Sequence, residues 1–167
     1  MSYHFAEHAI SPWAQLRAVR ATPNQILRAV GVLTPPVDVR DIASRLGIAM
    51  HEVPSPGWSG AVQSGSAGAH IWVPGEDAEV RKRFTIAHEI GHLMLHPDVT
   101  QFRDTNFRGD PQEASANRFA AALLMPAWML EHHARALGFD LDELARRFFV
   151  SRDAMKYRLL NLGYAIE

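Results

Sequence analysis

The chain of 167 residues has 17 Lys and Arg against 18 Asp and Glu, a net charge of −1, and no cysteine. This length and a hydrophobic content of 47% fit one globular domain. The lack of cysteine excludes disulfides and thiolate metal sites, so a bound metal would need histidine and carboxylate ligands. The near-neutral charge argues against a protein that lives on nucleic acid, because such proteins are usually more basic.

No membrane segment is predicted. The N-terminus lacks the apolar core of a signal peptide. The longest apolar stretch, residues 119–130, contains a proline and is much shorter than the roughly 20 residues of a membrane span. We therefore expect a cytoplasmic location.

Two short helices are predicted after an N-terminal arm that takes up residues 1–21. The segment "TPNQILRAVG" (22–31) has Thr22 as N-cap, a proline at the first helical position and a glycine just past its end. This pattern is typical of a short capped helix. The segment "PPVDVRDIASRLG" (35–47) repeats it, with Asp38 as N-cap and a final glycine.

A small antiparallel sheet is predicted next. Residues 48–54 alternate as a strand does, and a glycine- and serine-rich stretch ends in "AHIWV" (69–73), the second strand. This second strand is a candidate edge to which an extended peptide adds through backbone hydrogen bonds. An ordinary structural strand is the alternative, with His70 either facing a cleft or packed within the sheet.

Residues 76–95 form the strongest predicted helix. Acidic residues crowd its first turn, where the helix dipole favours anions, and Pro97 ends it. We interpret the basic run 81–83 as a solvated helix face. The buried stripe predicted from the helical period comprises Val80, Phe84, Ala87, Gly91 and Met94.

Three further helices complete a mainly helical α+β fold. One starts with Asp110 as N-cap and stops at Pro126. The other two cover residues 127–138 and 140–163, the latter broken near Val150. Helices that follow a small sheet in this order are typical of an α+β arrangement.

The sequence "HEIGH" at residues 88–92 is either a metal site or a helix that happens to carry histidines. On a helix, His88 and His92 project from one face about 6 Å apart, and both can hold one ion. Glu89 is placed to reach a water on that ion. His96 continues the same row, but it lies about 12 Å along the axis from His88. We reject it as a ligand and keep it as a cleft wall or transition-state donor.

A catalytic zinc site needs a third protein ligand. A zinc-protease signature with glycine at position 95 and histidine at 98 fails, because the chain has Leu95 and Asp98 there. The carboxylate of Asp98 stays an option as a ligand. Glu113 is the better candidate, since the small residues around it and Gly91 on the preceding helix allow a close approach.

Two alternatives remain open on this second helix. Glu113 would also complete a capping box with Asp110, although the upstream histidine pair favours its role as a ligand. Asn117 lies one turn after Glu113 on the same face. Asn117 or Asp110 is the candidate partner that fixes an imidazole tautomer.

The motif "RFTIAHEIGHLMLH" (83–96), followed by "EASANRFAAALLMP" (113–126), resembles the ImmA/IrrE family of metallopeptidases, and the similarity extends over roughly residues 20–163. The resemblance implies a reduced zincin-like core. It also implies one Zn²⁺ per chain, or Mn²⁺ or another divalent ion instead. His88, His92 and Glu113 are the implied ligands, with Glu89 as the catalytic acid and base. Ser115 departs from the Glu or Gln expected there, off the ligand face.

The expected domain organisation is the arm (1–21), a zincin-like core (22–130) and a C-terminal helical subdomain packed on it (131–167). The last of these has helix-turn-helix spacing. Residues 141–167 carry five Lys and Arg against four Asp and Glu, which is a weak electrostatic footprint for DNA. We therefore expect a structural subdomain or a protein-docking surface, and no direct DNA binding.

By this resemblance the protein is a cytoplasmic zinc-dependent endopeptidase that cleaves a regulatory protein. The expected substrate is a helix-turn-helix (Xre-like) repressor, whose cleavage would derepress phage, mobile-element or stress genes. One alternative is a component of a toxin–antitoxin pair with an antitoxin as partner. The other is a DNA- or partner-binding regulator with a structural or sensory metal site, which would have no need of Glu89 as a base.

Overall fold

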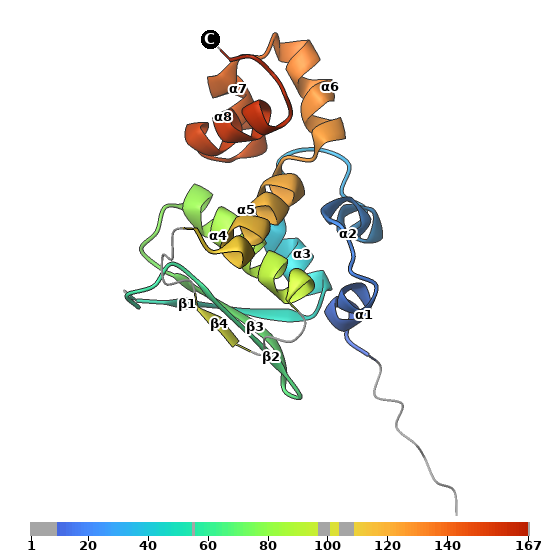
Figure 1. Cartoon of the computed structure of the whole chain (residues 1–167), viewed down its shortest axis with the longest axis vertical. Helices are drawn as coiled ribbons and strands as arrows, with labels where there is room; N and C mark the ends of the chain where they lie inside the picture. The colour runs from blue at the N-terminus through green and yellow to red at the C-terminus, as the bar shows by residue number, and fades with distance from the viewer. Residues whose placement is uncertain (1–9, 55, 97–100, 104–108, 167) are drawn as a thin grey trace, which may run out of the picture.

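The computed structural model describes residues 10–54, 56–96, 101–103 and 109–166. Its α+β architecture has a sheet at one end, helices α3 to α5 stacked on it, and α6 to α8 at the far end (Figure 1). In chain order the elements are α1 (Pro12–Ala18), α2 (Pro23–Val30), α3 (Val39–Arg45), β1 (Ile48–Val53), β2 (Ala61–Gly65), β3 (Gly68–Pro74), α4 (Glu79–Leu95), β4 (Gln101–Arg103), α5 (Pro111–Leu124), α6 (Ala127–Leu137), α7 (Leu141–Phe148) and α8 (Arg152–Asn161). The α+β fold class predicted from the sequence is confirmed.

The sheet is mixed, with the strand order β1-β3-β2-β4. The two strands predicted from the sequence, β1 and β3, pair in parallel rather than antiparallel. Both pairs made by β2, a strand that was not predicted, are antiparallel. The prediction was wrong for β1 because the chain crosses from β1 to the far side of the sheet, forms β2, and returns as β3 between them. β3 therefore has a hydrogen-bonded neighbour on each side. Of the two interpretations left open for this strand, the structural strand agrees with this position and the peptide-binding edge does not.

The predicted helix caps are confirmed where the structure describes them. Thr22 and Gln25 form a capping box, and the carboxylates of Asp38 and Asp110 accept backbone N–H groups in the first turns of α3 and α5. Helix α4 starts at Glu79 rather than at residue 76. The chain is still bound to the sheet just before it, because the N–H of Gly75 donates to the carbonyl of Val53 at 2.9 Å.

Part of the expected N-terminal arm belongs to the folded core. α1 buries Trp13 to 7% exposure, and the Trp13 N–H donates to the carbonyl of Leu46 at 3.0 Å. The sequence did not indicate this because Trp13 lies in a helix of seven residues, too short for a periodic pattern. Residues 1–9 of the arm lie outside the described part of the chain.

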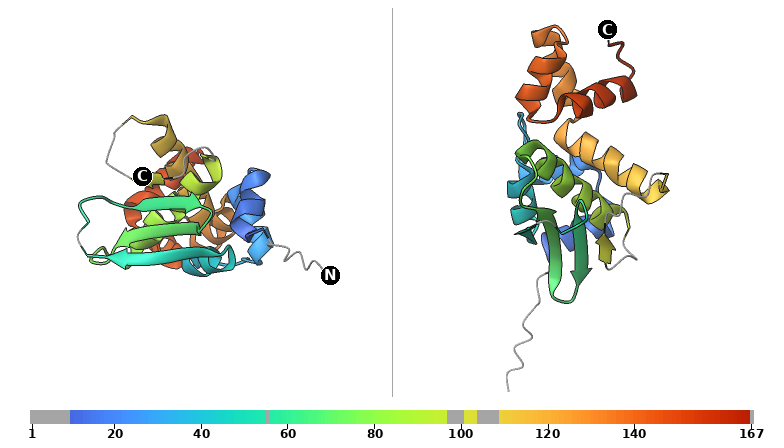
Figure 2. Two further views of the ribbon diagram at one scale, coloured as in Figure 1. Left: turned by 90° about the horizontal axis from the view of Figure 1, so that it is seen from below. Right: turned by 90° about the vertical axis from the view of Figure 1, so that its left-hand side faces the viewer.

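Helix α4 lies between the sheet and α5, and both contacts bury it. Val62, Ile71 and Val73 of the sheet and Ile86 and Ile90 of α4 are all buried in the one core cluster. Among the described residues, no helix covers the opposite face of the sheet (Figure 2, left). That outer face carries the half-buried side chains of His51, His70 and Trp72.

No described helix is long and apolar enough to cross a membrane.

The basic run 81–83 is not wholly solvated, which corrects the sequence interpretation at Arg83. The Arg83 side chain is buried at 6% exposure, and its guanidinium donates to the carbonyls of Phe149 (3.0 Å) and Phe148 (3.4 Å). Phe149, the C-terminal cap of α7, adopts the left-handed conformation at φ 52°, and the last carbonyls of a helix lack intrahelical donors. Arg83 supplies those donors, and burial lowers the pKa of its side chain.

A second guanidinium, that of the half-buried Arg158, attaches α8 to the core. Arg158 donates from Nε to the carbonyl of Met125 at 3.0 Å, at the C-terminal cap of α5. Burial lowers the pKa of this arginine as well. Together with Arg83, this contact fixes the corner between α7 and α8 against the helices of the core.

Candidate metal centre

Gly91 sets the distance between α4 and α5. A Cβ atom at this position would lie 3.2 Å from the carbonyl oxygen of Ala116 and 3.2 Å from Cβ of Phe119, tighter than ordinary van der Waals contact. The two helices are thus as close as a glycine permits. Their approach brings Glu113, in the first turn of α5, opposite the histidines of α4.

His88, His92 and Glu113 converge between these helices. The Nε2 atoms of the two histidines are 2.9 Å apart. The Glu113 carboxylate lies 3.0 Å from Nε2 of His88 and 3.3 Å from Nε2 of His92. The three side chains offer donor atoms that all lie within 4.8 Å of one another. The sequence therefore singled out three residues that the fold brings together.

The first turn of α5 resolves the competing interpretation of Glu113. Asp110 caps the helix through a bond from the Gln112 N–H to its carboxylate at 2.8 Å. The carboxylate of Glu113 points across to α4, where it contacts His88 and His92. The Glu113 side chain thus does not adopt the position of a capping residue.

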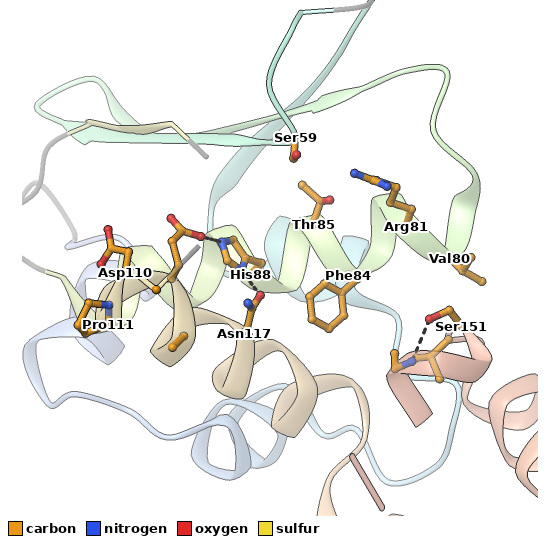
Figure 3. Close-up of a pocket in the computed structure, with 15 residues that line it drawn as sticks. Ser59, Val80, Arg81, Phe84, Thr85, His88, Asp110, Pro111, Asn117 and Ser151 are labelled. Carbon is orange, nitrogen blue, oxygen red and sulfur yellow. Dashed lines mark hydrogen bonds and ion pairs between the residues drawn. The ribbon is translucent and has the colours of Figure 1, made fainter. Parts of the chain in front are cut away.

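Asn117 fixes the orientation of His88 (Figure 3). Its side-chain oxygen lies 2.9 Å from Nδ1 of His88, so Nδ1 carries the proton and the neutral ring keeps its lone pair on Nε2. Of the two partners considered from the sequence, it is Asn117, not Asp110, that makes this contact. A hydrogen bond of this kind is the usual support for an imidazole that binds metal.

The neutral form of His92 is favoured by its surroundings. Burial, followed by the neighbouring rings of His88 and His96, lowers the pKa of His92 to about 3. A neutral imidazole is the form that binds metal. Two ligands at zinc distances and a tetrahedral angle are about 3.3 Å apart, close to the separations of 2.9, 3.0 and 3.3 Å found here. The donor set therefore fits a small divalent ion such as zinc.

Glu89 is completely buried, and Gly60 lies directly against it. A Cβ atom on Gly60 would be 2.5 Å from Oε1 of Glu89 and 2.6 Å from Cγ2 of Thr85. The backbone before β2 therefore lies so close to Glu89 that any side chain at position 60 would displace the Glu89 carboxylate. Sequence reasoning missed Gly60. The only signal was the glycine-rich stretch around it, which does not indicate one position.

His96 lies at the C-terminal cap of α4. Its ring centroid is 5.4 Å from that of His92, and its Nε2 is 3.5 Å from the hydroxyl of Ser115. In the described part of the chain it lies outside the lining of the cleft at this site. Asp98, the other ligand considered from the sequence, is not among the described residues.

A cleft of about 1010 Å³ opens beside this cluster and runs along α4. At one end lie His88 and Asp110, and at the other Val80 and Ser151, with Phe84 between them (Figure 3). Its lining comprises Ser59, Val80, Arg81, Phe84, Thr85, His88, Gly109, Asp110, Pro111, Glu113, Ala114, Asn117, Val150, Ser151 and Ala154. Two of the three candidate ligands, His88 and Glu113, are thus at the wall of a space large enough for a stretch of peptide.

The model of the IrrE N-terminal-like domain, a peptidase family, matches residues 43–160, more than two thirds of the chain. The chain belongs to this family. The match spans both helices of the candidate metal centre and ends within α8. The family resemblance stated from the two motifs is thereby confirmed.

Three relatives illustrate the similarity. The chain is 31% identical over 86 residues to metallopeptidase ImmA of Bacillus subtilis, covering 49% of this chain and 51% of ImmA. It is 40% identical over 88 residues to the radiation response metalloprotease IrrE of Deinococcus deserti, covering 47% and 31%. It is 37% identical over 70 residues to the uncharacterized immunity region protein 2 of Bacillus phage phi105, covering 40% and 44%. The chain spans about half, or less, of the length of these relatives.

A solved structure of a Mycobacterium tuberculosis transcriptional regulator has the same fold. It superimposes with a TM-score of 0.61, covering 92% of this chain and 52% of the regulator. The sequence identity is 20%, so the likeness concerns the fold alone.

Proposed function

We propose that this protein is a zinc-dependent endopeptidase with one metal ion per chain. The observation that carries this proposal is the convergence of His88, His92 and Glu113 within 4.8 Å, beside a carboxylate residue adjacent in sequence to His88. Two neutral imidazoles and one carboxylate form a common ligand set of catalytic zinc, with a position left for water. Mn²⁺ or another divalent ion is the alternative cofactor.

The residues around this ion have different roles in the proposed reaction. A bound divalent ion supplies Lewis-acid activation of a water molecule and of the peptide carbonyl. Glu89 takes up a proton at its carboxylate and delivers it to the leaving amine. Asn117 holds the tautomer of His88 through its 2.9 Å contact. Gly60, packed against Glu89, limits the positions that this carboxylate can adopt.

The substrate class that we propose is a regulatory protein, in particular a helix-turn-helix repressor of the Xre type. Similarity to ImmA, to an immunity region protein of a phage and to IrrE supports this class. Cleavage of the repressor would derepress phage, mobile-element or stress genes. The cytoplasmic location and the division at residue 130 remain predictions from the sequence.

A toxin–antitoxin pair would use the same chemistry, with the antitoxin as protein partner. A role as a DNA-binding regulator has less support. Two cations of α8 that a DNA-reading helix would present already have partners, because Arg158 donates to the carbonyl of Met125 and Arg152 to the carboxylate of Asp142. We expect no direct DNA binding.

The test compares the purified wild type with Glu89→Gln, using helix-turn-helix proteins encoded next to the gene as substrates. Metal content is measured on both proteins, and cleavage is followed by mass spectrometry before and after EDTA and zinc re-addition. We expect about one zinc per chain in both. Only the wild type should cut, and EDTA should abolish its cleavage. Absence of bound metal after zinc is supplied, or cleavage by Glu89→Gln, would overturn the proposal.

A further inference from the structure

The cleft changes character along its length. Beside His88 it is lined by carboxylate, amide and imidazole groups, whereas its other end is lined by Val80, Phe84, Val150 and Ala154. Val80 and Phe84 come from α4, Ala154 comes from the first turn of α8, and Val150 comes from the connection between α7 and α8. We call these four residues the apolar pocket.

The polar groups nearest this end make their own contacts. The hydroxyl of Ser151 accepts the N–H of Ala154 at 3.1 Å and caps α8. The guanidinium of Arg81 lies 3.2 Å from the carboxylate of Asp77. These polar groups already have partners within the protein. An apolar side chain is therefore the substrate group whose burial in the pocket is most favourable.

The wall supplied by the connection between α7 and α8 is fixed relative to the candidate metal ligands. Val150 is buried at 7% exposure. The two carbonyls just before it, those of Phe148 and Phe149, accept hydrogen bonds from Arg83. Arg83 lies on α4, the helix that carries His88 and His92. The apolar pocket is therefore held at a fixed distance from the metal centre, because one side of it is α4 and the other side is hydrogen-bonded to α4.

We propose that the apolar pocket takes one large aliphatic or aromatic side chain of the polypeptide substrate and so selects where the chain is cut. The proposal rests on the endopeptidase function above. α4 rises about 1.5 Å per residue, which places Phe84 about 6 Å and Val80 about 12 Å from His88 along the axis. An extended peptide spans about 3.3 Å per residue. The selected side chain thus lies about two to four residues from the cleaved bond.

The test uses peptide hydroxamates, whose hydroxamate group binds the metal, and compares wild type with Ala154→Phe. Each peptide carries a single leucine or serine two, three or four residues from the hydroxamate, which is placed at either end. Binding is measured by calorimetry on the zinc-loaded full chain. We expect leucine at one of these distances to bind about ten- to hundredfold more tightly than serine. Ala154→Phe, which fills the pocket, should remove this preference.

Two further variants complete the design. Ala136→Phe makes the same change at an exposed position of α6 outside the cleft lining, and it should keep the wild-type preference. Val80→Ser lowers the apolar character of the pocket without adding bulk, and it should weaken the preference even if Ala154→Phe folds poorly.

The outcomes separate the pocket from the catalytic proposal. Equal binding of leucine and serine peptides at every distance, or an undiminished preference in both pocket variants, would overturn the pocket. Binding does not require turnover, so a leucine preference in a protein that cleaves nothing would support the pocket and refute the endopeptidase. Cleavage of repressors without any leucine preference would refute the pocket alone.

Discussion

Two pairs of histidines in this protein bring ring nitrogens to nearly the same distance. Nε2 of His88 and Nε2 of His92 are 2.9 Å apart, and Nε2 of His51 lies 3.0 Å from Nδ1 of His70. The first pair comes from one helix and is buried between α4 and α5. The second pair joins neighbouring strands on the outer face of the sheet, where both rings stack with Trp72 at 5.2 and 5.7 Å.

The difference lies in the third group that each pair meets. Glu113 adds a carboxylate to the helical pair, and Asn117 orients one of its rings. Trp72 adds a ring without a lone pair to the strand pair, where one imidazole can donate to the other. Among the residues that the structure describes, the group suited to a metal ion is His88, His92 and Glu113. Proximity of two imidazoles is therefore not sufficient to make a metal site.

The largest expected effect comes from breaking one cluster and leaving the other. Glu113→Gln should lower zinc affinity by more than about a hundredfold, because losing a ligand costs more than the 10- to 100-fold typical of a supporting residue. His70→Gln should retain wild-type metal content. Zinc affinity is measured by competition with a chromophoric chelator. Metal loss in His70→Gln, or full retention in Glu113→Gln, would show that the two clusters have been distinguished wrongly.

The contact of Asn117 with His88 predicts a smaller effect at the same site. Asn117→Ala removes the acceptor at 2.9 Å from Nδ1, and it should weaken zinc binding by about 10- to 100-fold. Asn161→Ala, at the exposed end of α8, is the matched control and should bind zinc as the wild type does. Equal affinities in the two variants would mean that Asn117 does not support the ligand.

Two glycines of the same strand region extend the comparison to the backbone. Gly60→Ala places a Cβ 2.5 Å from Oε1 of Glu89. It should lower kcat about tenfold and stability by about 1–3 kcal/mol, as overpacking does, without loss of zinc. Gly65→Ala adds its Cβ where no atom lies within 4 Å. It should change neither kcat nor stability. Measurements of kcat, zinc content and thermal unfolding on both variants decide whether Gly60 matters through Glu89.

The sequence predicted what depends on local spacing. The helix caps contact residues within the next helical turn, as seen for Thr22, Asp38 and Asp110. His88 and His92 are one turn apart. The sequence pattern alone therefore indicated the roles of these residues. Glu113 was chosen as the third ligand because small residues around it allow a close approach to the histidine pair, and the family resemblance implied the same residue. The helix caps and the spacing of the histidine pair depend on fixed helical geometry, whereas the place of Glu113 also depends on how α5 packs on α4.

Features that depend on distant partners were missed. The parallel pairing of β1 with β3 depends on how the chain crosses the sheet. Arg83 meets carbonyls at residues 148 and 149, and in isolation it looked like part of a solvated basic run. Gly60 meets Glu89 through a connection that no periodic pattern describes. Long-range contacts of this kind decide packing but leave little local trace in the sequence.

The smallest expected effect concerns the strand pair. His51→Gln removes one stacked ring and one 3.0 Å contact from a half-buried surface, and an aromatic pair contributes about 0.5–1.5 kcal/mol. Urea unfolding should therefore show a loss of about 1 kcal/mol or less, with zinc affinity and cleavage unchanged. The sheet and α4 lie between the strand pair on the outer face and the space between α4 and α5 that holds the candidate metal ligands. A mutation of the strand pair should therefore leave the candidate metal ligands unchanged. A loss above about 3 kcal/mol, or a change in zinc affinity, would mean that the sheet transmits changes at its outer face to the metal ligands.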